Sequence, residues 1–491
     1  MSAGRTVAAA ALLLNACRAR PASPPPTAPP GPLTGWHYRV ALDEGLTTAE
    51  INICFDGLPP QFLVPGRTDA GKWLTHASAE GGKPLRRTRK HVDLAGLPPG
   101  SCVDMSLDLL EMAPTGGSSR VARRVGNSVL ARPSAWMWRP AVRPKNADVT
   151  VTFEMPAASR VSVPWPTEPG SPRDSSATYV LDDTAFDWLA YALWGEIDVL
   201  HIGHAGAEIE VATLDQPIAC TRPELERWLK DTTEIVAGAF GGSFPREQLQ
   251  LVLVPVGAHG GTVDFGMAAR GGGSAVFVLL DSGARGPDLM GTWTTVHEML
   301  HHGMPFIQEP WMAEGWVTYY TDVLRARHGN MTEEAAWARM AAGFARGDRG
   351  GRGITLRATS AAMHETYAYQ RVYWGGAALA LLTDVAIRED SGGTVTLDDA
   401  LVELRRCCGE TPKRWPADAL LSHLDAWYGK PLFTEVAERE LSRTTFPAVA
   451  EVLERLGVEV DDDGHVHLDD AHPGAALRRA IMQPRDDPQP R

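Results

Sequence analysis

Residues 295–322 read TVHEMLHHGMPFIQEPWMAEGWVTYYTD and carry most of the information about the fold. The stretch contains His297-Glu298-Met299-Leu300-His301, with apolar flanks that are typical of a buried helix. On a helix, side chains at positions i and i+4 lie on one face. Two imidazoles placed in this way can bind one Zn²⁺ at about 2.0–2.1 Å each. Glu298 lies beside the first histidine, where it can act as general base toward a metal-bound water.

A zinc site that hydrolyses a substrate needs a third protein ligand and one open position. Glu314 follows His301 within an apolar helical pattern, where an unpaired charge is costly. We therefore expect Glu314 to be the third ligand. Glu309 is the competitor, although it precedes Pro310 in a predicted loop. His302 is expected to support a ligand or to face solvent, and the metal-free alternative for the two ligand histidines is a hydrogen-bonded pair in the core.

Four further polar residues have open interpretations. Thr318 and Asp322 follow Glu314 by one and two helical turns, so either could orient a ligand histidine or simply lie on the helix surface. His201 and His204 form an HxxH pattern beside a predicted strand, which is more typical of a surface than of a second metal site.

The order HExxH and then W-x-x-E-G-x-x-x-Y resembles the signature of gluzincin peptidases, the thermolysin-like clan. The chain is most similar to the glycyl aminopeptidase family and more distantly to M1 aminopeptidases. Residues 373–388 (YWGGAALALLTDVAIR) and the later Leu397-Asp398-Asp399 also resemble that family, and the resemblance covers roughly residues 140–460. It implies a single Zn²⁺ on His297, His301 and Glu314, with Glu298 as base.

The same resemblance implies a role for Tyr373, whose phenol would stabilise the oxyanion of the tetrahedral intermediate. Tyr367 and Tyr369 are nearby substitutes, and a packed aromatic is the alternative for Tyr373.

The sequence departs from the family pattern in several places. Gly375 stands where the family has Lys, and the loop between His301 and Glu314 is several residues shorter than usual. Aminopeptidases of the clan hold the substrate amine with a Glu on the edge strand, but residues 260–270 contain Asp264 as their only acid. After about residue 430 some 60 residues remain, which are too few for the PDZ domain that the family often carries.

The pattern predicts a multidomain α+β protein, with an N-terminal antiparallel β domain, a thermolysin-like α/β catalytic domain and a C-terminal helical domain. The expected divisions are a signal peptide of lipoprotein type at 1–17, a Pro-rich linker at 18–35, the β domain at 36–170, the catalytic domain at 171–345, the helical domain at 346–480 and a tail at 481–491.

Leu14-Asn15-Ala16-Cys17 looks like a bacterial lipobox, so we expect export to the cell envelope, with a lipid anchor at Cys17, or secretion. Export permits disulfides. Cys54–Cys102 is the preferred pair, whereas Cys407 and Cys408 could bond to each other or one of them to Cys220. The net charge of −13 disfavours nucleic-acid binding.

The leading hypothesis is a zinc-dependent peptidase that acts on a peptide or protein substrate, with the exo or endo mode open. The alternative is a non-catalytic, zinc-retaining binding protein of the cell envelope with the same fold. A zinc hydrolase acting on a non-peptide amide is a third possibility. The oligomeric state is not predicted by the sequence.

Overall fold

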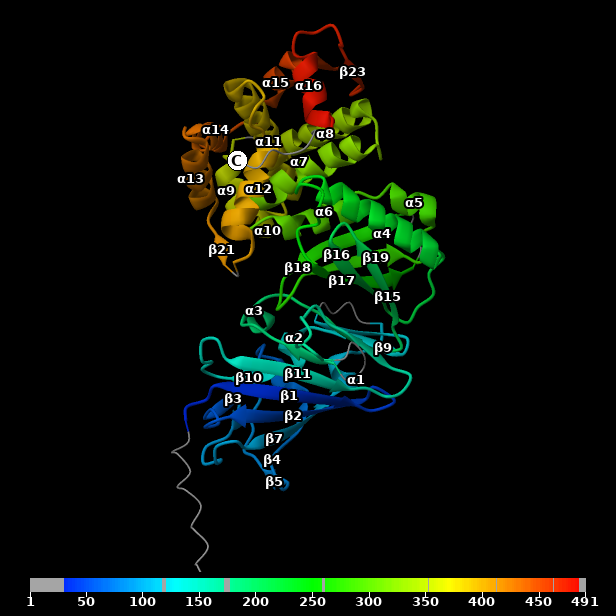
Figure 1. Ribbon diagram of the computed structural model, residues 1–491, viewed down its shortest axis with the longest axis vertical. Helices are drawn as coiled ribbons and strands as arrows, with labels where there is room; N and C mark the ends of the chain where they lie inside the picture. The colour runs from blue at the N-terminus through cyan, green and yellow to red at the C-terminus, as the bar shows by residue number, and fades with distance from the viewer. Residues whose placement is uncertain are drawn as a thin grey trace, which may run out of the picture.

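The computed structural model describes residues 31–116, 121–171, 177–257, 261–351, 353–411, 413–461 and 463–484. The predicted signal peptide, Cys17, most of the linker and most of the 481–491 tail lie outside these residues. Within them the chain has the predicted multidomain α+β architecture (Figure 1). Blue and cyan β-sheets occupy one end, a green mixed sheet lies in the middle, and helices fill the other end. No helix in the described ranges is long and apolar enough to cross a membrane.

The N-terminal region contains three sheets that are mostly antiparallel, with one parallel pair between β1 and β11. The first has the order β13-β11-β1-β2-β7-β4-β5: β13 (Thr178–Val180), β11 (Asp148–Glu154), β1 (Gly35–Leu42), β2 (Thr48–Asp56), β7 (Cys102–Asp108), β4 (Leu74–Ala79) and β5 (Lys83–Pro84). The second is β10 (Trp138–Pro140), β3 (Phe62–Pro65) and β6 (Val92–Asp93). The third is β12 (Arg160–Ser162), β14 (Ala192–Gly195), β9 (Ser128–Ala131) and β8 (Ala122–Val125).

This β region extends beyond the predicted boundary at residue 170, because β13 and β14 pair with N-terminal strands. Residues 163–171, next to that boundary, form a loop within the region. Trp165 is buried in the N-terminal core, and its indole N–H donates to the carbonyl of Gly271 at 2.9 Å. Short helices α1 (Leu109–Met112), α2 (Pro133–Trp136) and α3 (Thr184–Asp187) connect the strands.

The disulfide Cys54–Cys102 is confirmed, with the two residues directly opposite each other on β2 and β7. Cys407 and Cys408 bond to each other, which settles one of the alternatives that the sequence left open. Cys220 is buried and forms no disulfide within the described part of the chain.

The central sheet has the order β15-β16-β17-β19-β18: β15 (Asp198–His204), β16 (Ala207–Thr213), β17 (Gln248–Val256), β19 (Ala275–Asp281) and β18 (Val263–Ala269). The pairs β16–β17 and β17–β19 are parallel, and β18 runs antiparallel at the edge. Strand β17 is buried over Leu249–Val254, where every residue except Gln250 is apolar. Helix α4 (Arg222–Ala237) begins with a capping box at Thr221 and packs its apolar face against this core.

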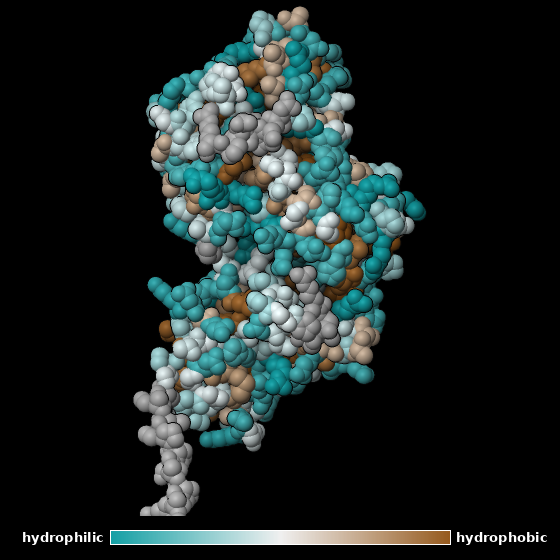
Figure 2. All heavy atoms as spheres, viewed as in Figure 1, coloured by the Kyte–Doolittle hydropathy of each residue, from teal (hydrophilic) through white to brown (hydrophobic). Residues whose placement is uncertain are grey.

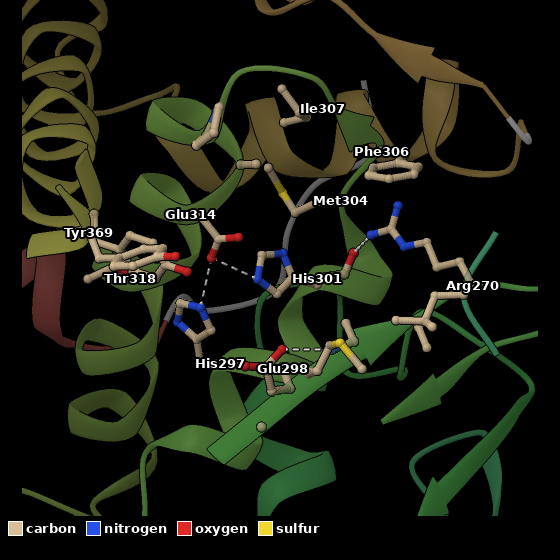
Figure 3. A pocket seen from close by; sticks show the side chains of 18 of the residues that line it. Arg270, His297, Glu298, His301, Met304, Phe306, Ile307, Glu314, Thr318 and Tyr369 are labelled. Atoms are coloured by element: carbon tan, nitrogen blue, oxygen red, sulfur yellow. Dashed lines mark hydrogen bonds and ion pairs between the residues drawn. The ribbon is translucent and has the colours of Figure 1, made fainter. Parts of the chain in front are cut away.

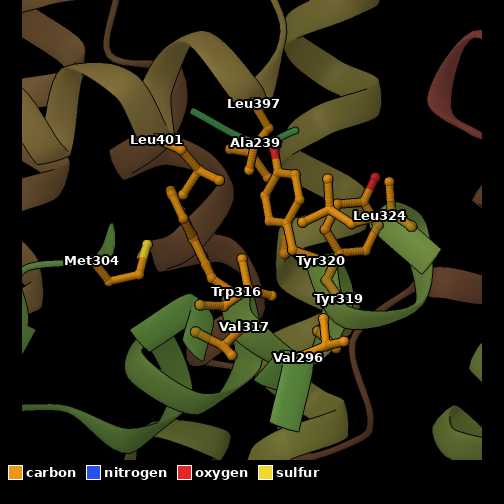
Figure 4. Packing of buried hydrophobic residues seen from close by; sticks show 14 of the residues in the cluster. Ala239, Val296, Met304, Trp316, Val317, Tyr319, Tyr320, Leu324, Leu397 and Leu401 are labelled. Atoms are coloured by element: carbon orange, nitrogen blue, oxygen red, sulfur yellow. The ribbon is translucent and has the colours of Figure 1, made fainter. Parts of the chain in front are cut away.

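Three helical segments follow the sheet: α5 (Gly286–Met290), α6 (Thr294–Leu300) and a 3₁₀ turn at His301–Gly303. The HExxH stretch lies in α6 and the first residue of the turn. Helix α7 (Pro310–His328) comes next, with proline at its first position and Gly329 in the left-handed region after its end. Figure 4 shows Trp316, Tyr319 and Tyr320 of α7 packed among apolar residues of neighbouring elements. Helix α7 is therefore buried over most of its length.

The remaining elements form the helical end of the molecule: α8 (Glu333–Arg349), α9 (Leu356–Ala361), α10 (Met363–Thr366), α11 (Tyr369–Ser391), α12 (Leu397–Leu404), a π-turn (Arg405–Gly409), α13 (Ala417–Tyr428), α14 (Leu432–Leu441), α15 (Val449–Arg455) and α16 (Ala475–Met482). Two small sheets pair β20 (Phe306–Ile307) with β21 (Arg414–Trp415), and β22 (Val458–Val460) with β23 (Val466–Leu468). The predicted boundary at residue 345 falls inside α8. Hydrophilic residues cover most of the face shown in Figure 2, where apolar atoms are confined to small areas.

Helices α7 and α11 approach each other closely enough for their backbones to touch. A Cβ atom on Gly315 would lie 2.3 Å from the Cα atom of Gly376. A Cβ atom on Gly376 would lie 1.9 Å from the carbonyl oxygen of Trp311. Only glycine fits at either position, and the contact fixes the distance between the two helices.

Replacing Gly376 with alanine should therefore destabilise the protein by about 1–3 kcal/mol, since the backbone of α7 must move away. The matched control is Gly375→Ala on the same helix, whose new Cβ would meet the flexible end of Leu356. Thermal unfolding of the two variants checks the prediction. Equal melting temperatures would show that the helix contact is not tight.

Candidate functional site

Two histidines on successive turns face one carboxylate. His297 lies on α6 and His301 opens the 3₁₀ turn that follows it, with their ring centres 5.0 Å apart. Glu314 comes from α7, and its Oε2 atom lies 3.3 Å from the Nε2 atom of each histidine. Figure 3 shows all three side chains converging on one point. The three potential ligand atoms lie within 4.8 Å of one another, which is close enough to share one ion.

The position of Glu314 follows from the helix contact described above. Gly315, the next residue, touches α11 and holds the first turns of α7 against the site. Burial alone would raise the pKa of Glu314, but His301 and His297 outweigh it and hold the pKa well below the usual carboxyl range. Glu314 is therefore an anion that faces two nitrogen ligands.

The hydrogen bonding of His297 fits a metal ligand. Thr321 donates its hydroxyl proton to the carbonyl of Val317 at 2.7 Å, so its oxygen is left as an acceptor. The Nδ1 atom of His297 lies 3.4 Å from that oxygen and can donate to it. The Nε2 atom then keeps a free lone pair toward Glu314. Two nitrogens and one oxygen are a donor set that suits Zn²⁺ and leaves one coordination position open.

Thr321 was not predicted, although it lies on the same face of α7 as Glu314, seven residues later. The sequence analysis proposed Thr318 and Asp322 for this role. Within the described residues, neither forms a hydrogen bond with a ligand histidine. Asp322 pairs with Arg339 at 2.9 Å, and the hydroxyl of Thr318 is buried in the cavity wall without a partner among those residues.

Glu298 lies on α6 between the ligands and the edge strand β18. Its Oε2 atom accepts the backbone N–H of Ala268 at 2.8 Å. Gly266 makes room for it, because a Cβ atom there would lie 2.7 Å from both the Cγ of Glu298 and the Cγ2 of Thr294. Burial, with a contribution from Glu314 and opposed by His297, raises the pKa of Glu298 to about 7. A carboxyl group with this pKa can accept and return a proton near neutral pH.

Tyr373 lies on α11 at the edge of the same group. Its ring is stacked parallel to His297 with the centres 6.1 Å apart, and its hydroxyl interacts with Glu314. Burial, together with the nearby carboxylates, raises the pKa of Tyr373 above its usual value, so the phenol is a donor. Of the two proposed substitutes, Tyr369 lines the cavity, whereas Tyr367 is 77% exposed and does not.

Glu309 and His302 have other partners. Glu309 accepts the backbone N–H of Ala417 at 2.6 Å, so its carboxylate caps α13. His302 is buried, and its Nε2 atom donates to the carbonyl of Ala275 at 3.0 Å. Burial lowers the pKa of His302 well below its usual value. The expectation of an exposed or ligand-supporting His302 is therefore wrong, because the 3₁₀ turn directs it into the core.

A second group of metal-capable side chains contains Glu403, Cys407 and His423. Its ligand atoms are already engaged: Cys407 is in a disulfide, and Glu403 binds Arg406 at 2.7 Å and His423 at 2.6 Å. His204 of the HxxH pattern lies 3.4 Å from Glu234 as a surface pair. Among the described residues, the HxxH pattern contributes to neither metal-capable group.

The edge strand offers no acid to the cavity. Asp264 is exposed and does not line the cavity, whereas Gly266, Met267, Ala268 and Ala269 do. Within the described part of the chain, the cavity acids are Asp187, Glu298, Glu314 and Asp322. The two aspartates each have an arginine partner: Asp187 pairs with Arg143 at 2.6 Å, and Asp322 pairs with Arg339.

No family model matches the chain, and no curated protein matches it either. Solved structures do match. An aminopeptidase N family protein from Idiomarina loihiensis is 16% identical, with a TM-score of 0.69, over 89% of this chain and 82% of that chain. An M1 zinc metallopeptidase from Deinococcus radiodurans is 16% identical, with a TM-score of 0.51, over 85% of this chain and 94% of that chain.

Yeast LTA4 hydrolase is 10% identical, with a TM-score of 0.51, over 89% of this chain and 73% of that chain. At such identities the similarity is one of fold. The finer resemblance to glycyl aminopeptidases stays a prediction. The chain therefore has the fold seen in M1-type aminopeptidase structures.

Proposed function

We propose that the protein is a zinc-dependent peptidase. The proposal rests on one observation: His297, His301 and Glu314 converge from separate elements, with Glu298 held beside them. The fold shared with M1 metallopeptidase structures supports it. The three converging side chains would hold a single Zn²⁺.

When bound, Zn²⁺ polarises a peptide carbonyl and makes water a stronger acid. Glu298 takes a proton from the attacking water and later gives it to the leaving amine. Its raised pKa suits both transfers. Tyr373 keeps its proton and donates a hydrogen bond to the oxygen that becomes negative in the transition state.

The proposed activity does not depend on a free N-terminus in the substrate. An ammonium group would need a carboxylate to hold it, and the acids that line the cavity within the described residues are otherwise engaged. We therefore propose that N-acetylated peptides are cleaved as readily as free ones.

The alternative, a zinc-retaining protein without activity, explains the altered edge strand. It leaves unexplained why Glu298 keeps a hydrogen bond to Ala268 and why Gly266 leaves space for its side chain. Those features are needed for a positioned base and not for metal retention.

Replacing Glu314 with alanine should lower the affinity for Zn²⁺ by more than about 100-fold, which is the upper range for loss of a group that only supports a ligand. Glu309→Ala is the control, because its carboxylate caps α13 instead. Competition with a chromophoric chelator measures both variants. Equal affinities would remove Glu314 from the site.

Replacing Glu298 with glutamine should keep the zinc and lower kcat by about 10²–10⁴-fold, since the base is lost. The control is Asp264→Asn, an exposed acid on the adjacent strand that does not line the cavity. Single-turnover assays on a mixed peptide library, with and without chelator, provide the measurement. Full turnover by the glutamine variant would exclude Glu298 as the base.

Gly266→Ala should lower kcat by about tenfold to hundredfold without changing zinc content, because the new methyl group displaces the carboxylate of Glu298. Gly291→Ala, near the start of α6, adds only an ordinary contact with the carbonyl of Asp288 at 3.5 Å and serves as control. Kinetics combined with metal analysis separates the two effects. Unchanged kcat in Gly266→Ala would mean that Glu298 can shift without consequence.

A further inference from the structure

The cavity around the metal-capable group has a volume of about 1670 Å³ and an unusual charge distribution. The whole chain is acidic, with a net charge of −13. The cavity, in contrast, is lined by five arginines: Arg132, Arg270, Arg339, Arg346 and Arg414. Its acids are either part of the catalytic group or already paired with arginine. The surplus of positive charge is therefore local and belongs to the cavity.

Arg270 directly follows the edge strand β18. One Nη atom donates to the carbonyl oxygen of His301, and the guanidinium lies 5.5 Å from the centre of the Phe306 ring (Figure 3). Arg270 forms no ion pair with any described residue. A half-buried cation without an anion is costly, so binding a substrate carboxylate at this position would be favourable.

Arg414 approaches the same aromatic ring from β21. Its guanidinium lies 4.6 Å from the centre of the Phe306 ring, and it also forms no ion pair within the described residues. Phe306 is held in turn by Trp188, in an edge contact with centres 4.8 Å apart. Two cations thus lie beside one ring, and both line the cavity that contains His301 and Glu314.

We propose that Arg270 and Arg414, which both lie against the Phe306 ring, bind a carboxylate of the substrate peptide. This inference rests on the proposed peptidase function and names its substrate class. Guanidinium groups bind carboxylates through paired N–H donors, and Arg270 still has donors that its bond to His301 does not use. The carboxylate comes from an acidic side chain near the scissile bond or from the C-terminus of the peptide.

The test uses N-acetylated, C-amidated peptides that are identical except for Glu, Gln or Lys at each position near the cleaved bond. A fourth peptide carries Gln and a free C-terminus. We expect kcat/KM to be at least about tenfold higher for one of the carboxylate-bearing peptides than for the amidated Gln peptide, mainly through KM. The Glu peptide and the free C-terminus distinguish the two sources of the carboxylate.

Arg414→Glu is the decisive variant, because Arg414 is exposed and its backbone position does not require the guanidinium. It should lose the preference and favour the Lys peptide. The matched control is Lys413→Glu, the same change of charge on the adjacent residue, whose ammonium contacts Trp415 and does not line the cavity. Arg270→Gln is informative only if zinc content is normal, since Arg270 also holds the turn of His301.

Equilibrium binding to the Glu298→Gln variant provides a readout without turnover. The preferred peptide should bind at least about tenfold more tightly than the amidated Gln peptide, and less so at high salt. Cleavage of all peptides at equal rates, or a preference that survives in Arg414→Glu, would overturn the carboxylate pocket. If no peptide is cleaved, the proposed function fails, and the binding comparison alone decides about the pocket.

Discussion

The backbone contact between α7 and α11 at Gly315 and Gly376 is the constraint on which the site depends. Glu314 immediately precedes the first glycine, and Tyr373 lies one turn before the second. The imidazoles come from α6 and the turn after it, which belong to the central region. The carboxylate of Glu314 and the phenol of Tyr373 lie beside the imidazoles only if α7 and α11 stay in contact. The same helix contact therefore stabilises the fold and positions the site.

The parts of the site that the sequence predicted are those determined by local spacing. His297 and His301 follow helical periodicity, and Glu314 stands out as a charge in an apolar helix. The disulfide Cys54–Cys102 follows from two cysteines in neighbouring strands of one β region. The ligand positions follow from short-range rules, whereas the disulfide joins residues that are 48 positions apart in the sequence.

The parts that were missed depend on how elements meet. Thr321 contacts His297 because of how α7 packs against α6, which the sequence of either helix does not specify. The predicted residue, Asp322, is the next one along the chain. His302 points into the core because α6 ends in a 3₁₀ turn, which rotates successive side chains differently from a helix. Arg270 has no ion-pair partner among the described residues, a feature that local sequence patterns do not indicate. The N-terminal β region extends past the predicted boundary at residue 170, because strands pair with partners that are distant in the sequence.

The turn that carries His301 is also tied to the far end of the chain. Arg246 donates to the carbonyl of His302 at 3.0 Å and to that of Gly409 at 2.7 Å, which joins the turn to the π-turn after α12. A truncation near residue 345 would cut through α8, remove this tie and open the face of α7 that α11 covers. The catalytic half is thus not an autonomous module, and exchange of segments between related enzymes would have to keep residues 246–409 together.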